Sequence, residues 1–363
     1  MIKSIKTAIV ATKSFNFNLG VISFLKNYYG RKNLDVLLIN TQNISLKNVL
    51  KLEKLYKKYL DINSINFINI PINNNKIENI NEKIYRQISD INFDILVARE
   101  QQYTMPKSDK IICMLFKYNN IILLEDNIFG YYLDKNNSLI LNYIYFIKSI
   151  FINTLFIIKN FNYIRNNKNF LSIYKPQIYT FRKNSKYRPT VFNEYQKIIN
   201  EESISASSLD DEHLEAIVLT DIYYFKSLNY YSSTPTIKEI NKGIDIYLKV
   251  IDQVSKKFNI EKKSIKIKLH PITDINLYKM IIDSDLRYYL FDDKINKLSL
   301  ELFINNLKKV KYCFAFGSSS LIYVEDLFKI ESYLIKSYLK IKEPNYIYYN
   351  KLIKLKKIKY INF

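Results

Sequence analysis

The chain has 363 residues, which is longer than most single domains, so two domains with separate cores are expected. Hydrophobic residues make up 48% and aromatic residues 15% of the sequence, which excludes an intrinsically disordered protein. The formal net charge of +21 favours an anionic partner: a nucleic acid, a membrane surface, or a phosphorylated or acidic substrate.

The first part of the chain alternates between strand and helix patterns. Helical spacing of apolar residues predicts helices at Phe17–Tyr29, Ser45–Leu60 and Asn79–Ile88. Short apolar runs rich in β-branched residues predict strands at Ile5–Ala11, Leu34–Ile39, Ile65–Ile70, Ile95–Ala98, Lys110–Phe116 and Asn120–Leu124. This alternation predicts a parallel sheet that is covered by helices on both faces.

Residues Leu139–Ile158 form the most apolar window of the sequence. The window is long enough to span a membrane, but Lys148 lies in its middle. Polar side chains recur at steps of three and four residues, at Asn142, Tyr145, Ser149 and Asn153. We therefore expect a buried or interfacial helix and not a transmembrane one.

The composition changes in the middle of the chain. Residues Asn162–Arg188 are basic and irregular, and Glu201–Glu212 are rich in serine and acidic residues, so we expect the linker between two domains in this stretch. The α/β pattern then returns, with predicted strands at Glu215–Leu219, Ser264–Leu269 and Val310–Phe316 and predicted helices at Thr236–Phe258, Leu298–Lys308 and Ser320–Phe328.

Two such halves predict an α/β protein of GT-B-like architecture. It would have two Rossmann-like domains and a ligand cleft between them, at the carboxyl ends of the strands. We place a first Rossmann-like domain at residues 1–195, a second at 213–335 and a basic tail at 336–363.

The two cysteines and the N-terminal segment indicate the compartment. Cys113 and Cys313 lie in apolar runs that resemble strands, and we interpret both as small buried side chains outside any disulfide or metal site. The N-terminal segment MIKSIKTAIVATKSF lacks the long apolar stretch and the cleavage site of a signal peptide. Both features predict a cytoplasmic protein.

An acidic pair follows the predicted strand at Asn120–Leu124. Glu125 and Asp126 stand at its carboxyl end, and Gly130 comes shortly after. A carboxylate in this position can act as a general base on an attacking hydroxyl group. The alternative is a helix-capping or turn residue, a role that suits Asp126 equally well.

His270 and Pro271 end a second apolar strand. Pro271 stops the strand, so we expect the imidazole of His270 at the edge of the ligand cleft, with Lys266 and Lys268 nearby. There it could contact a phosphate and stabilise or protonate a leaving group. A purely structural histidine is the alternative, and we take the other histidine, His213, to be a surface residue.

Gly317 leads from a third strand into Ser318, Ser319 and Ser320 and then into a predicted helix. Backbone N–H groups and the helix dipole make a helix N-terminus an anion site, here with three additional hydroxyl groups. Glycine would permit a sharp turn and a close approach of the ligand to the backbone. The alternative is simple capping of the helix by one of the serines.

The order of these three motifs resembles that of bacterial sialyltransferases, which carry a (D/E)-D-G motif, an HP motif and an S/T motif. The similar families are the lipooligosaccharide sialyltransferases (glycosyltransferase family 52) and the capsular polysialyltransferases. The corresponding residues are Glu125-Asp126-Asn127, His270-Pro271 and Ser318-Ser319-Ser320. The resemblance extends loosely from about Ile95 to Phe328. Asn127 replaces the glycine of the first motif, although asparagine tolerates left-handed backbone angles.

The resemblance implies a role for each matching residue. Glu125 would be the base on the acceptor hydroxyl, and Asp126 would help to hold the loop. His270 would meet the phosphate of CMP as an acid or a charge stabiliser. The three serines, with Gly317 before them, would bind the same phosphate.

The resemblance also implies the reaction. Such enzymes invert the sugar configuration, transfer sialic acid from CMP-sialic acid to a lipooligosaccharide or capsular glycan, and need neither a metal ion nor a cofactor. The implied location is the inner face of the bacterial membrane, where the enzyme is peripheral. Because similar folds can dimerise, a homodimer is compatible with the sequence.

The basic C-terminal segment YNKLIKLKKIKYINF could attach the protein to that membrane. A single helix over this segment would place five aliphatic side chains on one face and lysines around it, and so bind anionic lipid. The alternative is a last helix that packs back on the first domain. The aliphatic residues are Leu352, Ile353, Leu355, Ile358 and Ile361.

Two other functions compete with sialyl transfer. One is a GT-B glycosyltransferase that uses a different nucleotide sugar. The other is a nucleic-acid-binding protein, because a net charge of +21 with many tyrosines suits phosphates and stacked bases. We do not expect nucleic acid as a partner, since the lysines are spread along helices and no RNA-binding signature appears.

Overall fold

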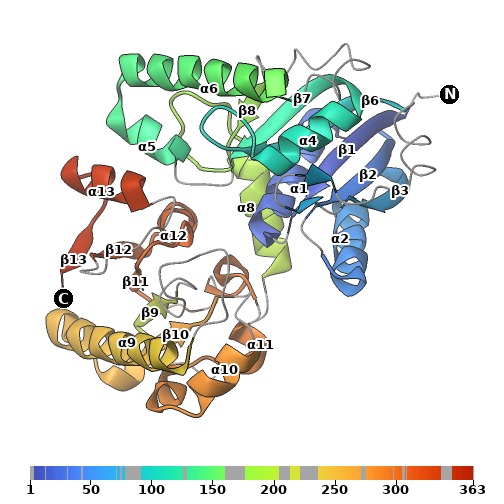
Figure 1. The fold of residues 1–363 in the computed structure, drawn as a ribbon. Helices are drawn as coiled ribbons and strands as arrows, with labels where there is room; N and C mark the ends of the chain where they lie inside the picture. The colour runs from blue at the N-terminus through green and yellow to red at the C-terminus, as the bar shows by residue number, and fades with distance from the viewer. Residues whose placement is uncertain are drawn as a thin grey trace. The chain divides into compact units, whose positions relative to one another are not determined.

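The chain forms two compact α/β units, Met1–Ile198 and Ile199–Phe363, in a computed structural model (Figure 1). Each unit has its own parallel sheet and its own core, and each is described separately below. The structure describes residues 4–12, 14–30, 32–41, 44–70, 72–73, 76–77, 91–125, 129–159, 176–203, 213–220, 236–270, 275–296, 298–304, 307, 309–336 and 346–362.

Six parallel strands form the sheet of the first unit in the order β3-β2-β1-β6-β7-β8. This is the strand order of a Rossmann fold. Successive strands are added toward one edge of the sheet and then toward the other, and this order reverses between the first and fourth strands, here β1 and β6. The strands are β1 (Ile5–Ala11), β2 (Leu34–Asn40), β3 (Ile62–Asn69), β6 (Asn92–Glu100), β7 (Lys117–Glu125) and β8 (Gln177–Tyr179).

Helices connect these strands and cover the sheet. The Ser14 hydroxyl caps α1 by accepting a hydrogen bond from the backbone N–H of Phe17 (3.2 Å), and the helix ends at Gly30, whose φ of 56° suits a glycine. The helices are α1 (Phe15–Tyr29), α2 (Leu46–Tyr59), α4 (Lys107–Leu115), α5 (Phe129–Asn136), α6 (Leu139–Lys159) and α8 (Phe192–Glu202), and a small antiparallel pair consists of β4 (Ile72–Asn73) and β5 (Lys76–Ile77).

The strand predicted at Lys110–Phe116 is wrong, because this segment belongs to helix α4. β6 and β7 are parallel neighbours, and a connection between parallel neighbours needs a crossover, which α4 provides. Asp109 fixes the start of the helix, since its buried carboxylate pairs with Arg99 at 2.5 Å. Cys113 is a buried thiol outside any disulfide, as predicted, but on a helix.

The linker predicted over Asn162–Arg188 is also wrong in its last third. β8 adds a sixth strand to the sheet, and the chain after it returns to the core through buried side chains at Phe181, Arg182 and Arg188. The boundary between the two units lies at Ile198/Ile199, between the end of the first predicted domain at 195 and the start of the second at 213. The helix predicted at Asn79–Ile88 lies outside the described residues.

Five parallel strands form the sheet of the second unit in the order β10-β9-β11-β12-β13. Counted along the chain this order is 2-1-3-4-5, the other common order of doubly wound sheets, with its reversal point between β9 and β11. The strands are β9 (Ala216–Leu219), β10 (Ile265–Lys268), β11 (Tyr312–Ala315), β12 (Glu331–Lys336) and β13 (Tyr360–Asn362).

The longest helix of the second unit is α9 (Ile237–Phe258), which begins with a capping box between Thr236 and Glu239. Its buried face packs on the core of this sheet. The other helices are α10 (Ile275–Ile282), α11 (Asp293–Asn296), α12 (Ser320–Phe328) and α13 (Tyr346–Lys354). The helix predicted at Leu298–Lys308 is wrong, because the described part of that stretch holds only turns and a 3-10 segment at Leu300–Leu302.

The single amphipathic helix expected at the C-terminal end does not form. Helix α13 stops at Lys354, and β13 then pairs in parallel with β12 as the fifth strand of the second sheet. Leu352 and Ile361 are 0% and 1% exposed. Because two of the five aliphatic side chains proposed to meet lipid are in this core, the segment cannot present that face to a membrane.

Candidate functional site

The carboxyl end of the second sheet gathers the residues singled out in the second half of the sequence. β9 lies between β10 and β11, so Thr220, at the end of β9, stands between His270 and Gly317. Ligands of doubly wound sheets bind at this edge, where the strand order reverses. The structure therefore places His270 and the serine run on either side of the reversal point between β9 and β11.

Thr220 ties the ends of two of these strands together. Its buried hydroxyl accepts a hydrogen bond from the backbone N–H of His270 (3.0 Å), and its own backbone N–H donates to the carbonyl of Lys268 (3.0 Å). Sequence analysis did not single out Thr220, although its position directly after the apolar run AIVL marks it as a strand-end residue. Pro271 lies outside the described residues.

The imidazole of His270 is held in its neutral form at neutral pH. Removal of water by the surrounding protein, followed by the nearby ammonium of Lys268, lowers the pKa of His270 to about 4. The residue nevertheless keeps exposed surface, so a ligand can reach it. A neutral ring can donate one N–H group to an incoming anion.

Lys268 supports this strand end from inside the protein. Its side chain is 3% exposed, and its ammonium donates to the backbone carbonyls of Leu269 (2.6 Å) and Asn296 (2.8 Å). The Asn296 side chain accepts in turn from the backbone N–H of Leu269 (3.0 Å). Burial lowers the pKa of Lys268 to about 7, against the opposing effect of Glu301. Lys268 therefore holds this strand end in place through its bonds to backbone carbonyls, and its charge helps to lower the pKa of His270.

The serine run forms the start of helix α12. The hydroxyl of Ser318 accepts from the backbone N–H of Ser320 (3.3 Å), so Ser318 performs part of the capping role that was the alternative interpretation. Within the described residues, the hydroxyls of Ser319 and Ser320 make no hydrogen bond. All three serines are partly exposed, and the last two are thus available to a ligand.

Gly317 is not required for a left-handed turn. Among the described glycines only Gly30 has a positive φ. The chain bends at residues 316–317, as expected, but without a left-handed backbone angle, so the remaining reason for a glycine there is close approach of a ligand to the backbone.

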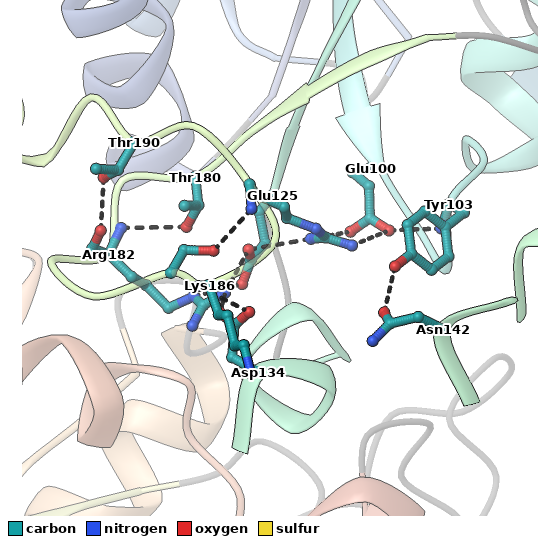
Figure 2. Close-up of polar contacts among 11 residues, drawn as sticks. Glu100, Tyr103, Glu125, Asp134, Asn142, Thr180, Arg182, Lys186 and Thr190 are labelled. Carbon is teal, nitrogen blue, oxygen red and sulfur yellow. Dashed lines mark hydrogen bonds and ion pairs between the residues drawn. The ribbon is translucent and has the colours of Figure 1, made fainter. Parts of the chain in front are cut away.

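A buried cluster of charges occupies the carboxyl ends of β6 and β7 in the first unit (Figure 2). Glu100 and Glu125 are register partners on these neighbouring strands. Two arginines from the segment after β8 lie against them. We call this group the arginine–carboxylate cluster; it consists of Glu100, Glu125, Asp134, Arg182 and Arg188, and each of these side chains is less than 10% exposed.

Glu125 is the centre of this cluster. Its two oxygens accept from Arg182 at 2.8 and 2.9 Å, and one of them also accepts from Arg188 at 3.0 Å. Arg188 continues to Glu100 at 3.2 Å, and Arg182 to Asp134 at 2.8 Å. Arginine favours such paired contacts because its planar fork matches a carboxylate.

The two glutamates have opposite electrostatic environments. Burial alone would raise the pKa of Glu125, but the charges of Arg182 and Arg188 outweigh it and hold that pKa below its usual range. Burial raises the pKa of Glu100, and the single arginine beside it does not compensate. Glu125 is therefore firmly ionised, and Glu100 is the group of this cluster that holds a proton more readily.

Gly130 is needed for this cluster to close. A Cβ atom at this position would collide with the Glu125 carboxylate and the Arg188 guanidinium. The glycine near the acidic pair thus lets helix α5 approach the charged groups, a contact that the sequence could not show.

The geometry limits how Glu125 can act as a base. Its carboxylate is 1% exposed and accepts hydrogen bonds from both arginines, so an acceptor hydroxyl reaches it only after these groups move. Asp126 and Asn127 lie outside the described residues. The assignment of the base to Glu125 thus stays a prediction, and Glu100, Arg182 and Arg188 are the residues of this strand end that sequence analysis missed.

The described residues contain no group of three or more His, Cys, Asp or Glu side chains placed to hold a metal ion.

Comparison with known proteins supports the fold. The sequence matches no family profile and no curated protein. Among solved structures, the GT-B domain of a Photobacterium damselae sialyltransferase superposes with a TM-score of 0.50 at 11% identity, covering 99% of each chain. A putative UDP-N-acetylglucosamine 2-epimerase from Listeria monocytogenes gives 0.49 at 10% identity, covering 98% of this chain and 88% of the other. The chain therefore has the GT-B fold of glycosyltransferases, as predicted.

Proposed function

We propose that this protein is an inverting, metal-independent sialyltransferase that moves sialic acid from CMP-sialic acid to a glycan acceptor. The observation that carries the proposal is the arrangement at the carboxyl edge of the second sheet. His270 flanks the point where the strand order reverses, as do the hydroxyls of Ser319 and Ser320, which make no hydrogen bond to any described residue. These are the residues that the HP and S/T motifs assign to the phosphate of the donor.

The chemistry of sialyl transfer suits this edge. When the bond to sialic acid breaks, negative charge grows on the phosphate of the departing CMP. The N-terminus of α12, two serine hydroxyls and the imidazole of His270 would be fixed donors to that charge, which lowers the barrier directly. The bound phosphate would raise the pKa of His270, so the imidazole would take up a proton from solvent and pass it to the phosphate oxygen as the bond to sialic acid breaks.

On the acceptor side, we propose that the acidic pair Glu125-Asp126 supplies the base. A carboxylate at a strand end accepts the proton as the acceptor hydroxyl attacks the anomeric carbon. The arginine–carboxylate cluster would hold the end of β7 rigidly and so position the pair. If Glu125 is the base, Arg182 and Arg188 must release it; if Asp126 is the base, the cluster is purely structural.

A panel of nucleotide sugars tests the donor. With a neutral glycan acceptor such as a labelled lactoside, and with a chelator present throughout, we expect transfer from CMP-sialic acid and none from UDP- or GDP-sugars. NMR of the first-formed product should show inverted anomeric configuration. Transfer from a UDP- or GDP-sugar instead would favour another GT-B transferase, and loss of activity in the chelator would refute metal independence.

Two isosteric variants separate the members of the acidic pair. Glu125→Gln and Asp126→Asn are compared for transfer per folded molecule and for CMP affinity. The base should lose about 10²–10⁴-fold in turnover with CMP affinity nearly intact, because the base acts on the acceptor. If neither variant loses turnover, the base does not come from this strand end.

A salt titration of binding to a generic oligonucleotide tests the nucleic-acid alternative. We expect the protein to bind the oligonucleotide only weakly.

A further inference from the structure

Helix α6 of the first unit is attached to the body of the protein by its polar side. Asn153, 1% exposed, accepts a hydrogen bond from the hydroxyl of Thr104 (2.6 Å), and Asn142 accepts one from the hydroxyl of Tyr103. Both partners belong to the turn after β6. The predicted polar stripe thus exists, but it faces inward, and Ser149 on the same side is buried as well.

The opposite side of α6 is apolar and exposed. Ten large hydrophobic side chains have between 36% and 75% of their surface exposed within the structure. We call them the α6 apolar face: Leu139, Ile140, Tyr143, Ile144, Phe146, Ile147, Phe151, Ile152, Leu155 and Ile158. Soluble monomers rarely show a continuous apolar patch of this kind, so we expect another molecule to bind there. Figure 1 shows α6, in green, at the periphery of the first unit.

The stretch of sequence that contains α6 carries charges of one sign. From Lys135 to Asn193 the sequence contains ten Lys or Arg residues and no Asp or Glu. Two of the ten, Arg182 and Arg188, are neutralised in the arginine–carboxylate cluster, and three others, Arg165, Lys168 and Lys175, lie outside the described residues. Lys148 is exposed in the middle of the helix, and Lys186 lies at its amino end, where it donates to Asn137 (2.8 Å).

We propose that the α6 apolar face docks on an anionic lipid bilayer, with the helix lying in the headgroup region parallel to the membrane surface. Apolar side chains would enter the acyl boundary while the surrounding lysines meet anionic headgroups. At a rise of 1.5 Å per residue, the 21 residues of α6 provide a contact about 30 Å long. This inference does not depend on the proposed enzymatic activity.

A membrane-spanning role does not fit the contacts of α6. By length and composition it is the one helix, among those described, that could cross a bilayer. Crossing would break the hydrogen bonds to Tyr103 and Thr104 and place Asn142, Asn153 and Lys148 in hydrocarbon. Each such group is expensive to bury there.

A second copy of the chain fits the α6 apolar face less well than anionic lipid does. A two-fold contact between antiparallel α6 helices would be centred near residue 149, because the helix runs from 139 to 159. Lys148 would then face its own copy, with no acidic residue in the helix to offset the repulsion. Anionic lipid has the complementary charge.

Vesicle co-sedimentation of the full chain tests the proposal. The test variant is Ile144→Glu/Phe151→Glu, which changes two exposed residues seven apart on the α6 apolar face. The matched control is Leu46→Glu/Leu50→Glu, which changes two similarly exposed residues on α2. Vesicles are phosphatidylcholine with or without phosphatidylglycerol. Circular dichroism checks that each variant is folded, and sedimentation velocity gives its oligomeric state.

We expect the wild-type chain and the α2 control to bind phosphatidylglycerol vesicles and to be released by alkaline carbonate. The α6 variant should bind at least about 100-fold more weakly, since it loses apolar contact and gains repulsion. Lys148→Ala should weaken binding about fivefold. Equal binding of the α6 variant and the control, or no binding by the wild type, overturns the proposal. A wild-type dimer that the α6 variant dissociates would assign the face to a second copy instead, and retention in carbonate would overturn the interfacial placement.

Discussion

Glu125→Gln should destabilise the first unit much more than Glu100→Gln, although the two residues are register partners with the same chemistry. Glu125 accepts from Arg182 at 2.8 and 2.9 Å and from Arg188 at 3.0 Å, while Arg188 meets Glu100 at 3.2 and 3.4 Å. Breaking a buried ion pair from one side costs about 3–5 kcal/mol. A glutamine in place of Glu100 still accepts from the backbone N–H of Tyr103 and should cost about 1 kcal/mol or less.

The assay is thermal and urea unfolding at neutral pH, with hydrogen exchange read on peptides from β6 and β7. A difference of about 2 kcal/mol between the variants corresponds to a gap of about 4–8 °C in Tm for a unit of this size. Hydrogen exchange assigns the loss to the first unit, so that unfolding of the second unit does not confuse the comparison.

The pH dependence of the two variants should have opposite signs. Because the pKa of Glu125 is depressed in the folded state, its contribution is present above its unfolded pKa and is lost as pH falls through the folded value. The penalty of Glu125→Gln should therefore shrink on acidification. Because the pKa of Glu100 is raised, wild-type stability falls as pH rises from the unfolded pKa to the folded one, and Glu100→Gln should gain relative to it. Equal losses at neutral pH, or a Glu125→Gln penalty that acid does not reduce, would refute the reasoning.

Three further predictions concern the donor edge and the glycine of the cluster. His270→Ala, and separately Ser319→Ala/Ser320→Ala, should each lower turnover about 100-fold in a folded protein, and the serine change should also weaken CMP binding by calorimetry. CMP affinity should rise as pH falls from 8 towards about 4, since a bound phosphate raises the pKa of His270 from about 4, and His270→Ala should flatten that profile. Gly130→Ala should cost about 1–3 kcal/mol in urea unfolding, because its methyl group meets the Glu125 carboxylate; an unchanged midpoint would contradict the packing described.

The elements that sequence analysis predicted well are those with a local signal. The helix at Ser320–Phe328 has the predicted bounds, because the serines mark its start and its apolar spacing continues to the end. The strand at Ile5–Ala11 is likewise confirmed, since a short apolar run with β-branched residues favours a buried strand. Both sheets are parallel, as the alternation of strands and helices predicted.

The errors arose where distant residues decide the outcome. The run IICMLF has no clear period, and only the parallel pairing of β6 with β7 requires it to be a helix. The basic segment before Arg188 was predicted to be a linker because its composition is basic and irregular. In the structure, however, Arg182 and Arg188 are neutralised by Glu125, which lies 57 and 63 residues away in the sequence. No local pattern indicates such pairs. Thr220 was missed for the same reason, because its importance comes from lying between two other strand ends.

The all-parallel sheet of the first unit also governs how that unit acquires its structure. Pairing β1 with β2 joins positions 29 apart (34 − 5), but pairing β1 with β6 joins positions 88 apart (95 − 7). The longer loop costs about 1 kcal/mol more in closure entropy, so β1–β2 should form early and β1–β6 late. Those two late partners border the point where the strand order reverses. The part of the first sheet best placed to receive a ligand is thus the last to be assembled, and a chain that stalls in folding lacks it while already holding most of its secondary structure.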